Sequence, residues 1–180
     1  MPVTLDPLLE PETTGLRDGT RVTLRPVRPE DAPRLQTLHA RLSPQSVYLR
    51  WLSAHPVLAD DEAASLSQVD YHDRMAYVAI LPDASPDEIM GVARYAASLG
   101  EGPGVAEAAV VVADAYQQRG LGTLLLRRLL AYARTQGLTT WVADINAENA
   151  RMLRFIQRGG LPTTKRLDTG SWQVRIDISA

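Results

Sequence analysis

Residues 114–123, DAYQQRGLGT, constrain this chain more than any other stretch of its sequence. They join a run of small apolar residues, 104–114, to a leucine-rich segment, 120–137, whose apolar residues recur at helical spacing. Gly120 and Gly122 let the backbone curl around a ligand at the expected helix N-terminus. Four amides there have no partner within the helix, and the helix dipole adds partial positive charge. The segment therefore predicts a pocket for phosphate or pyrophosphate.

Two common phosphate-binding loops do not fit this turn. The nucleoside-triphosphate loop needs Gly-Lys-Ser/Thr, and residues 114–123 contain no lysine. The dinucleotide fingerprint needs a third glycine where Leu125 stands. A plain strand-to-helix turn with Gly120 as the helix N-cap is the alternative that these residues leave open.

Composition excludes several classes of protein. The chain has no cysteine, and its three histidines show no ligand spacing, so we expect no disulfide, no thiolate nucleophile and no metal site. A formal net charge of −2 gives no reason to expect a nucleic-acid partner. No apolar run reaches the ~18 residues of a membrane span, and residues 1–20 lack the basic and apolar parts of a signal peptide. We expect a cytoplasmic protein without a membrane partner.

Hydrophobic periodicity predicts an α/β fold built on one mixed sheet with helices on both faces. The turn-rich residues 82–87 would join two strands into a hairpin, and residues 163–179 would form a closing hairpin around 168–170. Residues 104–114 are small and apolar enough for a strand buried on both faces. The other strands are expected at 21–27, 75–81, 88–98 and 139–145, and helices at 28–42, 43–52, 60–70, 120–137 and 149–159.

The length of 180 residues fits a single domain with a sizeable core. We expect this domain over residues 20–180, preceded by an N-terminal arm over 1–19 that is loose or lies on the surface.

Two motifs carry a family resemblance. Gln117-x-x-Gly120-x-Gly122, opening a helix after a strand, resembles the acyl-CoA loop of the GNAT superfamily of N-acyltransferases. Downstream, Asn149-x-x-Met152-x-x-Phe155 followed by Gly-Leu is similar to the family's Asn-x-x-Ala-x-x-Leu-Tyr…Gly-Phe helix. The order of elements also fits over about residues 20–178. The resemblance implies the GNAT fold and an acetyl-CoA-dependent N-acetyltransferase.

A narrower resemblance is carried by LSPQSVYLRW, VDYHDRMAYVAI, GVARY and AEAAVVVADAYQQRGLGTLLL. These segments look like the catalytic domain of bacterial Pat-type protein lysine acetyltransferases, which act on AMP-forming acyl-CoA synthetases. The resemblance implies transfer to a primary amine, in the first instance a protein lysine. In that group the domain is often fused to regulatory or synthetase-like domains, for which 180 residues leave no room, so regulation is in doubt.

The resemblance also assigns the residues that hold acetyl-CoA. Amides of the loop would take the pyrophosphate, and strand 110–112 would pair with the pantetheine arm as an added strand. The amide of Val111 or Val112 would polarise the thioester carbonyl, and Asn149 would contact the pantetheine or ribose. The expected cofactor-binding residues are Val110, Val111, Val112, Gln117, Gln118, Arg119, Gly120, Leu121, Gly122, Thr123, Asn149 and Met152.

Glu107 is the candidate general base. It is the only charged residue between Gly104 and Asp114, where we expect its carboxylate to be desolvated and therefore a stronger base. A lysine amine, with a pKa near ~10.4, needs such a base or a water relay at neutral pH. Glu107 also matches the base position of the Pat-type enzymes. The alternative is a carboxylate on a half-exposed edge that points into water.

Other polar residues allow two interpretations each. The family's usual general acid, a tyrosine, is replaced by Ile156, as commonly in Pat-type domains, which leaves the proton donor to the thiolate unassigned. Residues 70–74, with Asp70, Tyr71 and Arg74, could line the acceptor cleft or form a structural ion pair. Tyr48, Arg50 and Trp51 could recognise the acceptor or pack.

Two other functions stay open from the sequence alone. One is acetylation of a small-molecule amine, such as an amino acid, polyamine or antibiotic. The other is a non-catalytic acyl-CoA sensor, against which the presence of Glu107 argues. The oligomeric state is also open, and the closing hairpin could expose an edge that pairs in a homodimer.

Overall fold

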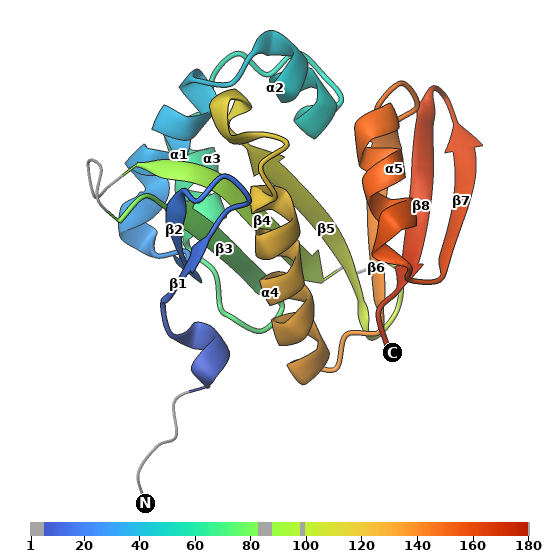
Figure 1. Cartoon of the computed structure of the whole chain (residues 1–180). Coiled ribbons are helices and arrows are strands. Elements are labelled where there is room, and N and C mark those ends of the chain that lie inside the picture. The colour runs from blue at the N-terminus through green and yellow to red at the C-terminus, as the bar shows by residue number, and fades with distance from the viewer. Residues whose placement is uncertain (1–5, 83–87, 98–99, 180) are drawn as a thin grey trace, which may run out of the picture.

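The computed structural model describes residues 6–82, 88–97 and 100–179. Eight strands form one sheet in the order β1-β2-β3-β4-β5-β6-β8-β7 (Figure 1). All neighbouring strands are antiparallel except β5 and β6, so the sheet is mixed, as the sequence predicts. The strands are β1 (Glu12–Gly15), β2 (Arg21–Pro26), β3 (Arg74–Ile80), β4 (Ile89–Ala97), β5 (Val105–Val112), β6 (Thr140–Asn146), β7 (Thr163–Asp168) and β8 (Ser171–Asp177).

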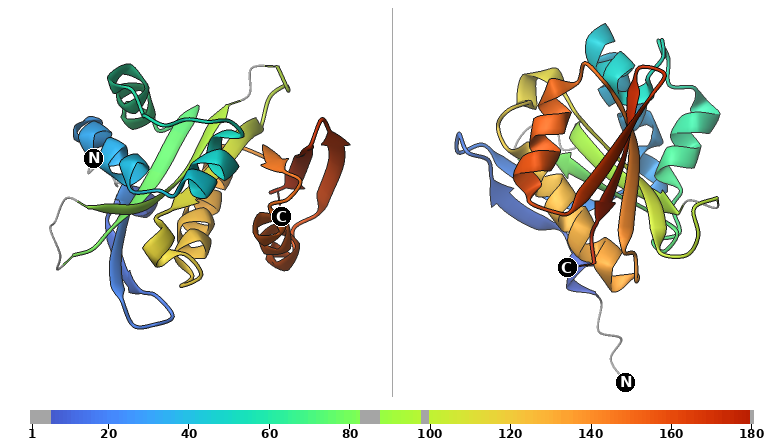
Figure 2. Two further views of the ribbon diagram at one scale, coloured as in Figure 1. Left: turned by 90° about the horizontal axis from the view of Figure 1, so that it is seen from above. Right: turned by 90° about the vertical axis from the view of Figure 1, so that its right-hand side faces the viewer.

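Helices cover both faces of this sheet, which confirms the predicted fold class (Figure 2). The apolar side of α4 packs on β3, β4 and β5, and α1–α3 lie on the opposite face. No helix in the described part of the chain is long and apolar enough to cross a bilayer. The helices are α1 (Ala32–Ala40), α2 (Pro44–Trp51), α3 (Asp60–Ser67), α4 (Leu121–Thr135) and α5 (Ala150–Gly159), with short 3-10 turns η1 (Pro7–Leu9), η2 (Pro29–Asp31) and η3 (Asp114–Tyr116).

Most predicted elements are present within a few residues of their expected bounds. Ser43 caps α2 by accepting a hydrogen bond from the amide of Ser46 at 3.2 Å, as the Ser-Pro pair indicates. β3 and β4 pair antiparallel, as the expected hairpin requires, although residues 83–87 of its turn lie outside the described residues. β7 and β8 form the closing hairpin.

The N-terminal segment differs from the expected arm, because its described residues belong to the domain. β1 pairs with β2, and Leu16 is buried in the core beside α4. Arg128 of α4 donates hydrogen bonds to main-chain carbonyls of η1, and the Tyr77 hydroxyl donates to Leu8 O at 2.6 Å. The segment is short and polar, so its own pattern gives no strand signal; partners more than 60 residues away hold it.

Gly91 of β4 lets α4 and β5 approach closely. A Cβ at this position would lie 3.1 Å from Val111 O, 3.2 Å from Leu125 Cδ1 and 3.3 Å from Val112 Cγ2. We expect Gly91→Ala to lower the free energy of unfolding by about 1–3 kcal/mol, because the added methyl group overpacks this layer. Chemical denaturation checks this against Gly15→Ala, where a Cβ would meet nothing within 4 Å. Equal losses in the two variants would contradict it.

Candidate functional site

Strand β5 has an open edge over half its length. It pairs with β4 from Ala106 to Val112, but with β6 only from Val105 to Glu107. The amide of Ala113 donates to Met90 O at 2.8 Å on the β4 side. Because alternate residues of a strand turn their backbone groups to opposite sides, Val110 and Val112 present theirs to the open edge.

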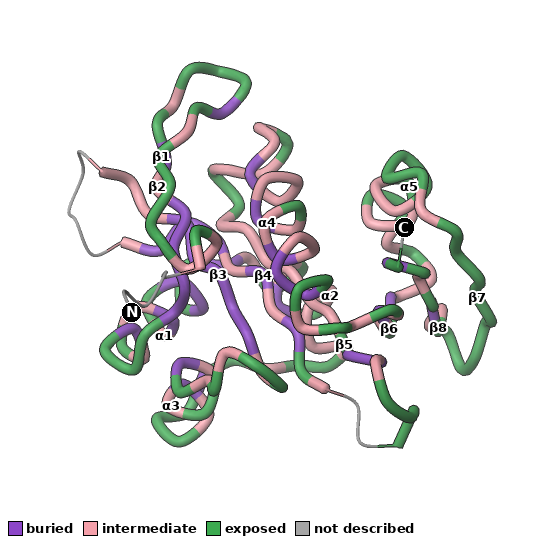
Figure 3. Tube along the Cα trace, turned by 90° about the horizontal axis from the view of Figure 1, so that it is seen from below, coloured by how far each residue is buried: buried purple, intermediate pink, exposed green. Residues whose placement is uncertain are grey.

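The expectation that this strand is buried on both faces is wrong. Residues 108–112 are only partly buried (Figure 3). Glu107 is exposed. The small apolar composition fits a central strand, but β6 diverges from β5 after residue 107, so no neighbour covers this edge. Alternation also turns the amide of Val111 toward β4. Of the two amides that the sequence offered for the thioester carbonyl, only that of Val112 faces the opening.

The glycine turn lies directly after this open edge. Gln118 and Gly120 adopt left-handed backbone angles, φ +64° and +96°, and α4 begins at Leu121. Within the described residues, the amides from Gln118 to Thr123 donate no hydrogen bond. A set of unpaired amides at a helix N-terminus is the anion-binding feature that the sequence predicts.

Gln117 connects three parts of the site. Its Nε2 donates to Val112 O and to Ser46 Oγ, each at 3.1 Å, and its Oε1 accepts a hydrogen bond from Arg151 of α5. The side chain therefore ties the end of β5 to α2 and reaches across to α5. The bond to Val112 O agrees with a carbonyl that faces away from β4.

Asp114 fixes helix α2 beside the turn. Its carboxylate accepts from Ser43 N at 3.0 Å and from the hydroxyls of Ser43 and Ser46 at 2.8 Å each. The sequence suggested only the end of a strand here. Burial raises the pKa of this carboxyl, but the hydrogen bonds from Ser43 and Ser46 outweigh it and hold the pKa below its ordinary value of 3.8.

This lowered pKa predicts a pH dependence of stability. A carboxyl whose pKa is lower in the folded state stabilises the fold above about pH 4, and the contribution disappears as the pH falls through the folded value. We expect the difference in unfolding free energy between the wild type and Asp114→Asn to be constant from pH 5 to 7 and to shrink below pH 4. Urea unfolding across that range measures it, and a difference that grows in acid would contradict the assignment.

The remaining expected cofactor residues take structural contacts as well. Arg119 pairs with Asp18 at 3.0 Å and lies over the Tyr116 ring. Asn149 caps α5, because its Oδ1 accepts from the amide of Met152 at 3.0 Å. This leaves the Asn149 amide nitrogen for a ligand. Leu121 is buried in the core under α4, so only its backbone can serve the turn.

Glu107 lies in a cavity of about 180 Å³ at the other end of β5. The desolvated carboxylate that the sequence predicts is not observed, since Glu107 is exposed. Arginines dominate the charged lining of the cavity. The lining residues are Arg50, Leu66, Arg74, Arg94, Tyr95, Ala96, Glu107 and Ala109.

The structure separates the residues that the sequence left ambiguous. Asp70 accepts from the amides of His72 and Arg74 at 2.9 and 2.8 Å, and the Tyr71 hydroxyl donates to Val27 O at 2.9 Å, so both stabilise local structure. Arg74 lines the cavity. Sequence reasoning missed Arg94, whose signal is a charge at an inward position of an otherwise apolar strand.

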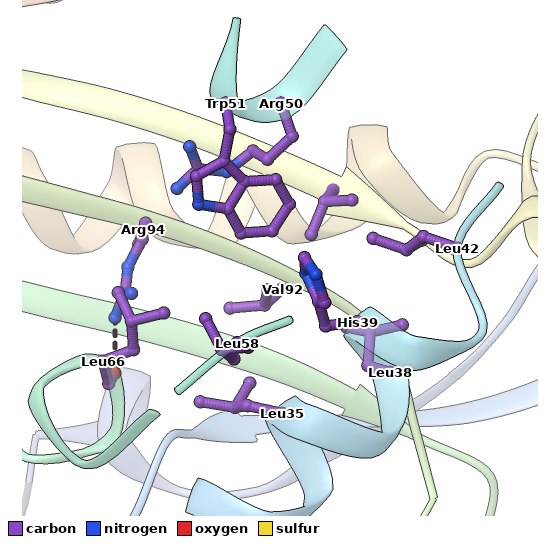
Figure 4. Close-up of a pocket in the computed structure, with 11 residues that line it drawn as sticks. Leu35, Leu38, His39, Leu42, Arg50, Trp51, Leu58, Leu66, Val92 and Arg94 are labelled. Carbon is purple, nitrogen blue, oxygen red and sulfur yellow. Dashed lines mark hydrogen bonds between the residues drawn. The ribbon is translucent and has the colours of Figure 1, made fainter. Parts of the chain in front are cut away.

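Helix α2 adds a second, smaller pocket of about 30 Å³ beside this cavity (Figure 4). Trp51 stacks on His55 with ring centroids 5.0 Å apart and meets the buried His39 edge-on at 4.8 Å. Arg50, from the same helix, lines both pockets. Trp51 therefore packs, whereas Arg50 reaches the cavity of Glu107.

A mixed sheet that opens between two parallel strands, beside a helix N-terminus with unpaired amides, offers an edge for an extended ligand and a site for its anionic group. The chain belongs to the GNAT acetyltransferase family, because the family model described as Acetyltransferase (GNAT) domain matches residues 21–162. It is therefore an N-acetyltransferase, an enzyme that moves an acetyl group to an amine.

Known proteins support this membership. The chain is 37% identical over 142 residues to Acetyltransferase PA5475 of Pseudomonas aeruginosa, covering 77% of this chain and 73% of that protein. It is 28% identical over 171 residues to Acetyltransferase Pat of Mycolicibacterium smegmatis, covering 94% of this chain and 50% of that protein. The chain thus spans about half the length of that relative. The crystal structure of the GNAT domain of S. lividans PAT superposes with a TM-score of 0.83 at 26% identity, covering 93% and 96% of the two chains.

Proposed function

We propose that this protein transfers the acetyl group of acetyl-CoA to a lysine side chain of another protein, with Glu107 as the general base. The observation that carries the proposal is the arrangement along β5. Unpaired amides lie beyond its C-terminal end, an open edge runs along residues 108–112, and a cavity that contains the carboxylate of Glu107 lies at its other end. The donor and the acceptor could therefore approach the strand from its two ends.

On the donor side, the pyrophosphate of acetyl-CoA would bind the amides of residues 118–123. The pantetheine arm would pair with the open edge of β5 as an extra strand. An amide of this edge, that of Val110 or Val112, would then donate to the thioester carbonyl and stabilise the negative charge that develops on its oxygen. Asn149 and Met152 would contact the arm from α5.

On the acceptor side, the lysine would enter the cavity as an ammonium ion and lose a proton to Glu107, directly or through water. The neutral amine then attacks the thioester carbonyl, its nitrogen loses a second proton to solvent as the C–S bond breaks, and CoA leaves as a thiolate that takes a proton from solvent. Ile156 cannot donate that proton. A thiolate with a pKa near ~8.5 is a tolerable leaving group without a dedicated acid.

The choice of a protein lysine rests on the resemblance to Pat-type enzymes. It is tested by intact-mass spectrometry of an AMP-forming acetyl-CoA synthetase incubated with acetyl-CoA, with and without this protein. We expect one added acetyl group, absent when the catalytic lysine of the synthetase is replaced by arginine. An unchanged mass, with acetyl-CoA still bound by this protein, would reject the synthetase as acceptor and direct the search to small amines.

A further inference from the structure

The cavity beside Glu107 carries more positive than negative charge. Helix α2 supplies Arg50, β3 supplies Arg74 and β4 supplies Arg94. Strand register places Arg74 and Glu107 on either side of Ala96, in one row across the sheet. Arg94 stands in the next row on the same face. Three guanidinium groups therefore share a cavity with one carboxylate.

Most of the hydrogen-bond donors of these arginines are unused. Arg74 and Arg94 each donate to a main-chain carbonyl in the last turn of α3, Arg94 to Leu66 O at 2.5 Å (Figure 4). Each guanidinium has five N–H donors, so several remain on both. Arg50 lies over the Trp51 ring at 4.9 Å, and within the described residues it makes no hydrogen bond or ion pair.

Burial of these arginines makes it unfavourable to keep several positive charges in one cavity. Burial, together with the nearby charges of Arg50 and Arg74, lowers the pKa of Arg94 to about 10. Burial also lowers the pKa of Arg50, although the charge of Glu107 counteracts it. At neutral pH the guanidinium groups stay charged, so a carboxylate entering the cavity would relieve their mutual repulsion and form charge-assisted, bidentate hydrogen bonds.

We propose that the acceptor presents a carboxylate to Arg50, Arg74 and Arg94, and that the lysines acetylated by this protein lie next to an aspartate or glutamate. This inference rests on the proposed function and names the acceptor class of the same site. A bare ammonium ion would approach a cavity of net positive charge. An acidic neighbour supplies the missing negative charge while the lysine meets Glu107.

The test uses pairs of single-lysine peptides that differ only in glutamate or glutamine on both sides of the lysine. Initial rates of CoA release give kcat/KM for each peptide, and mass spectrometry places the acetyl group on the lysine. We expect kcat/KM to be about tenfold or more higher for the glutamate peptide. Added salt should shrink this ratio, because it screens the partly exposed charges.

Variants test whether the cavity arginines cause the preference for the glutamate peptide. Arg50→Gln should bring the ratio close to one, and Arg50→Lys should leave part of it, because the charge stays and the planar fork is lost. Arg127→Gln, at an exposed arginine of α4 on the other face of the sheet, is the matched control and should keep the wild-type ratio. The ratio compares two acceptors on one protein sample, so a general loss of folded enzyme cancels.

Each failure has a distinct meaning. Equal rates with the two wild-type peptides, or a ratio that survives in Arg50→Gln, would overturn the inference and leave protein lysine acetylation standing. Equal rates with the two wild-type peptides are what we would expect if the three arginines only lowered the pKa of the acceptor amine. If neither peptide nor the synthetase is acetylated while a free amino acid is, the proposed function fails together with the inference.

Discussion

Glu107→Gln is expected to lower kcat by about 10²–10⁴-fold, the usual contribution of a positioned general base. The substitution keeps the size of the side chain and removes only its ability to accept a proton. The affinity for acetyl-CoA should be unchanged, because the proposed donor contacts lie at the turn and at residues 108–112. Stopped or continuous assays of CoA release give kcat, and calorimetric titration gives the acetyl-CoA affinity.

The side chain of Glu107 is exposed to solvent. An exposed carboxylate can exchange its proton with water quickly, so a water relay between the amine and Glu107 is compatible with the geometry. Glu101→Gln is the matched control, since Glu101 is exposed and pairs with Arg175 away from the cavity. If Glu107→Gln and the wild type have equal kinetics, the amine reaches the enzyme deprotonated and Glu107 has no role as base.

The strand, turn and helix of the proposed donor side could be predicted from the sequence because their signals are local. The turn at 117–123 needs glycine at a left-handed position and lies between a strand and a helix that each show their own periodicity. Its unpaired amides follow from the geometry of any helix N-terminus. Asn149 could equally be placed at the start of a helix, but its capping bond to the Met152 amide shows that part of a motif can be structural.

The acceptor side could not be read in the same way because it is assembled from distant segments. Arg50, Arg74 and Arg94 come from three elements, and only the fold turns them toward one cavity. The burial of β5 was overestimated for the same reason: apolar composition predicts a covered strand, whereas the divergence of β6 after residue 107 depends on the whole sheet. The pairing of β1 with β2 likewise owes little to the polar residues 12–15.

A large loss of stability is expected from substitution of Asp31, which lies between β2 and α1. Its fully buried carboxylate accepts from both terminal nitrogens of Arg25 at 2.7 and 2.8 Å, from the Arg28 amide at 2.9 Å and from Arg34 at 2.9 Å. Burial raises the pKa of Asp31, but these hydrogen bonds, led by that from Arg25, hold it below 3.8. The group is therefore ionised at neutral pH and neutralises an arginine that is only 8% exposed.

Asp31→Asn is expected to lower the free energy of unfolding by about 3–5 kcal/mol, because it leaves the Arg25 charge buried without a counter-charge. For a chain of this length that corresponds to a fall in Tm of roughly 6–20 °C, which differential scanning calorimetry measures. Asp18→Asn is the matched control, since it breaks a solvent-exposed pair with Arg119 and should change Tm little.

Helix α1 starts at this ion pair, and its Leu35, Leu38 and His39 line the smaller pocket together with Arg50 and Trp51 of α2. Loosening α1 would disturb the pocket that Arg50 also lines, so Asp31→Asn should also weaken the preference for acidic acceptors at temperatures where the protein is still folded. A variant as stable as the wild type would contradict this prediction, because the existing hydrogen bond from Arg25 to the Pro26 carbonyl at 3.0 Å would then suffice without the carboxylate.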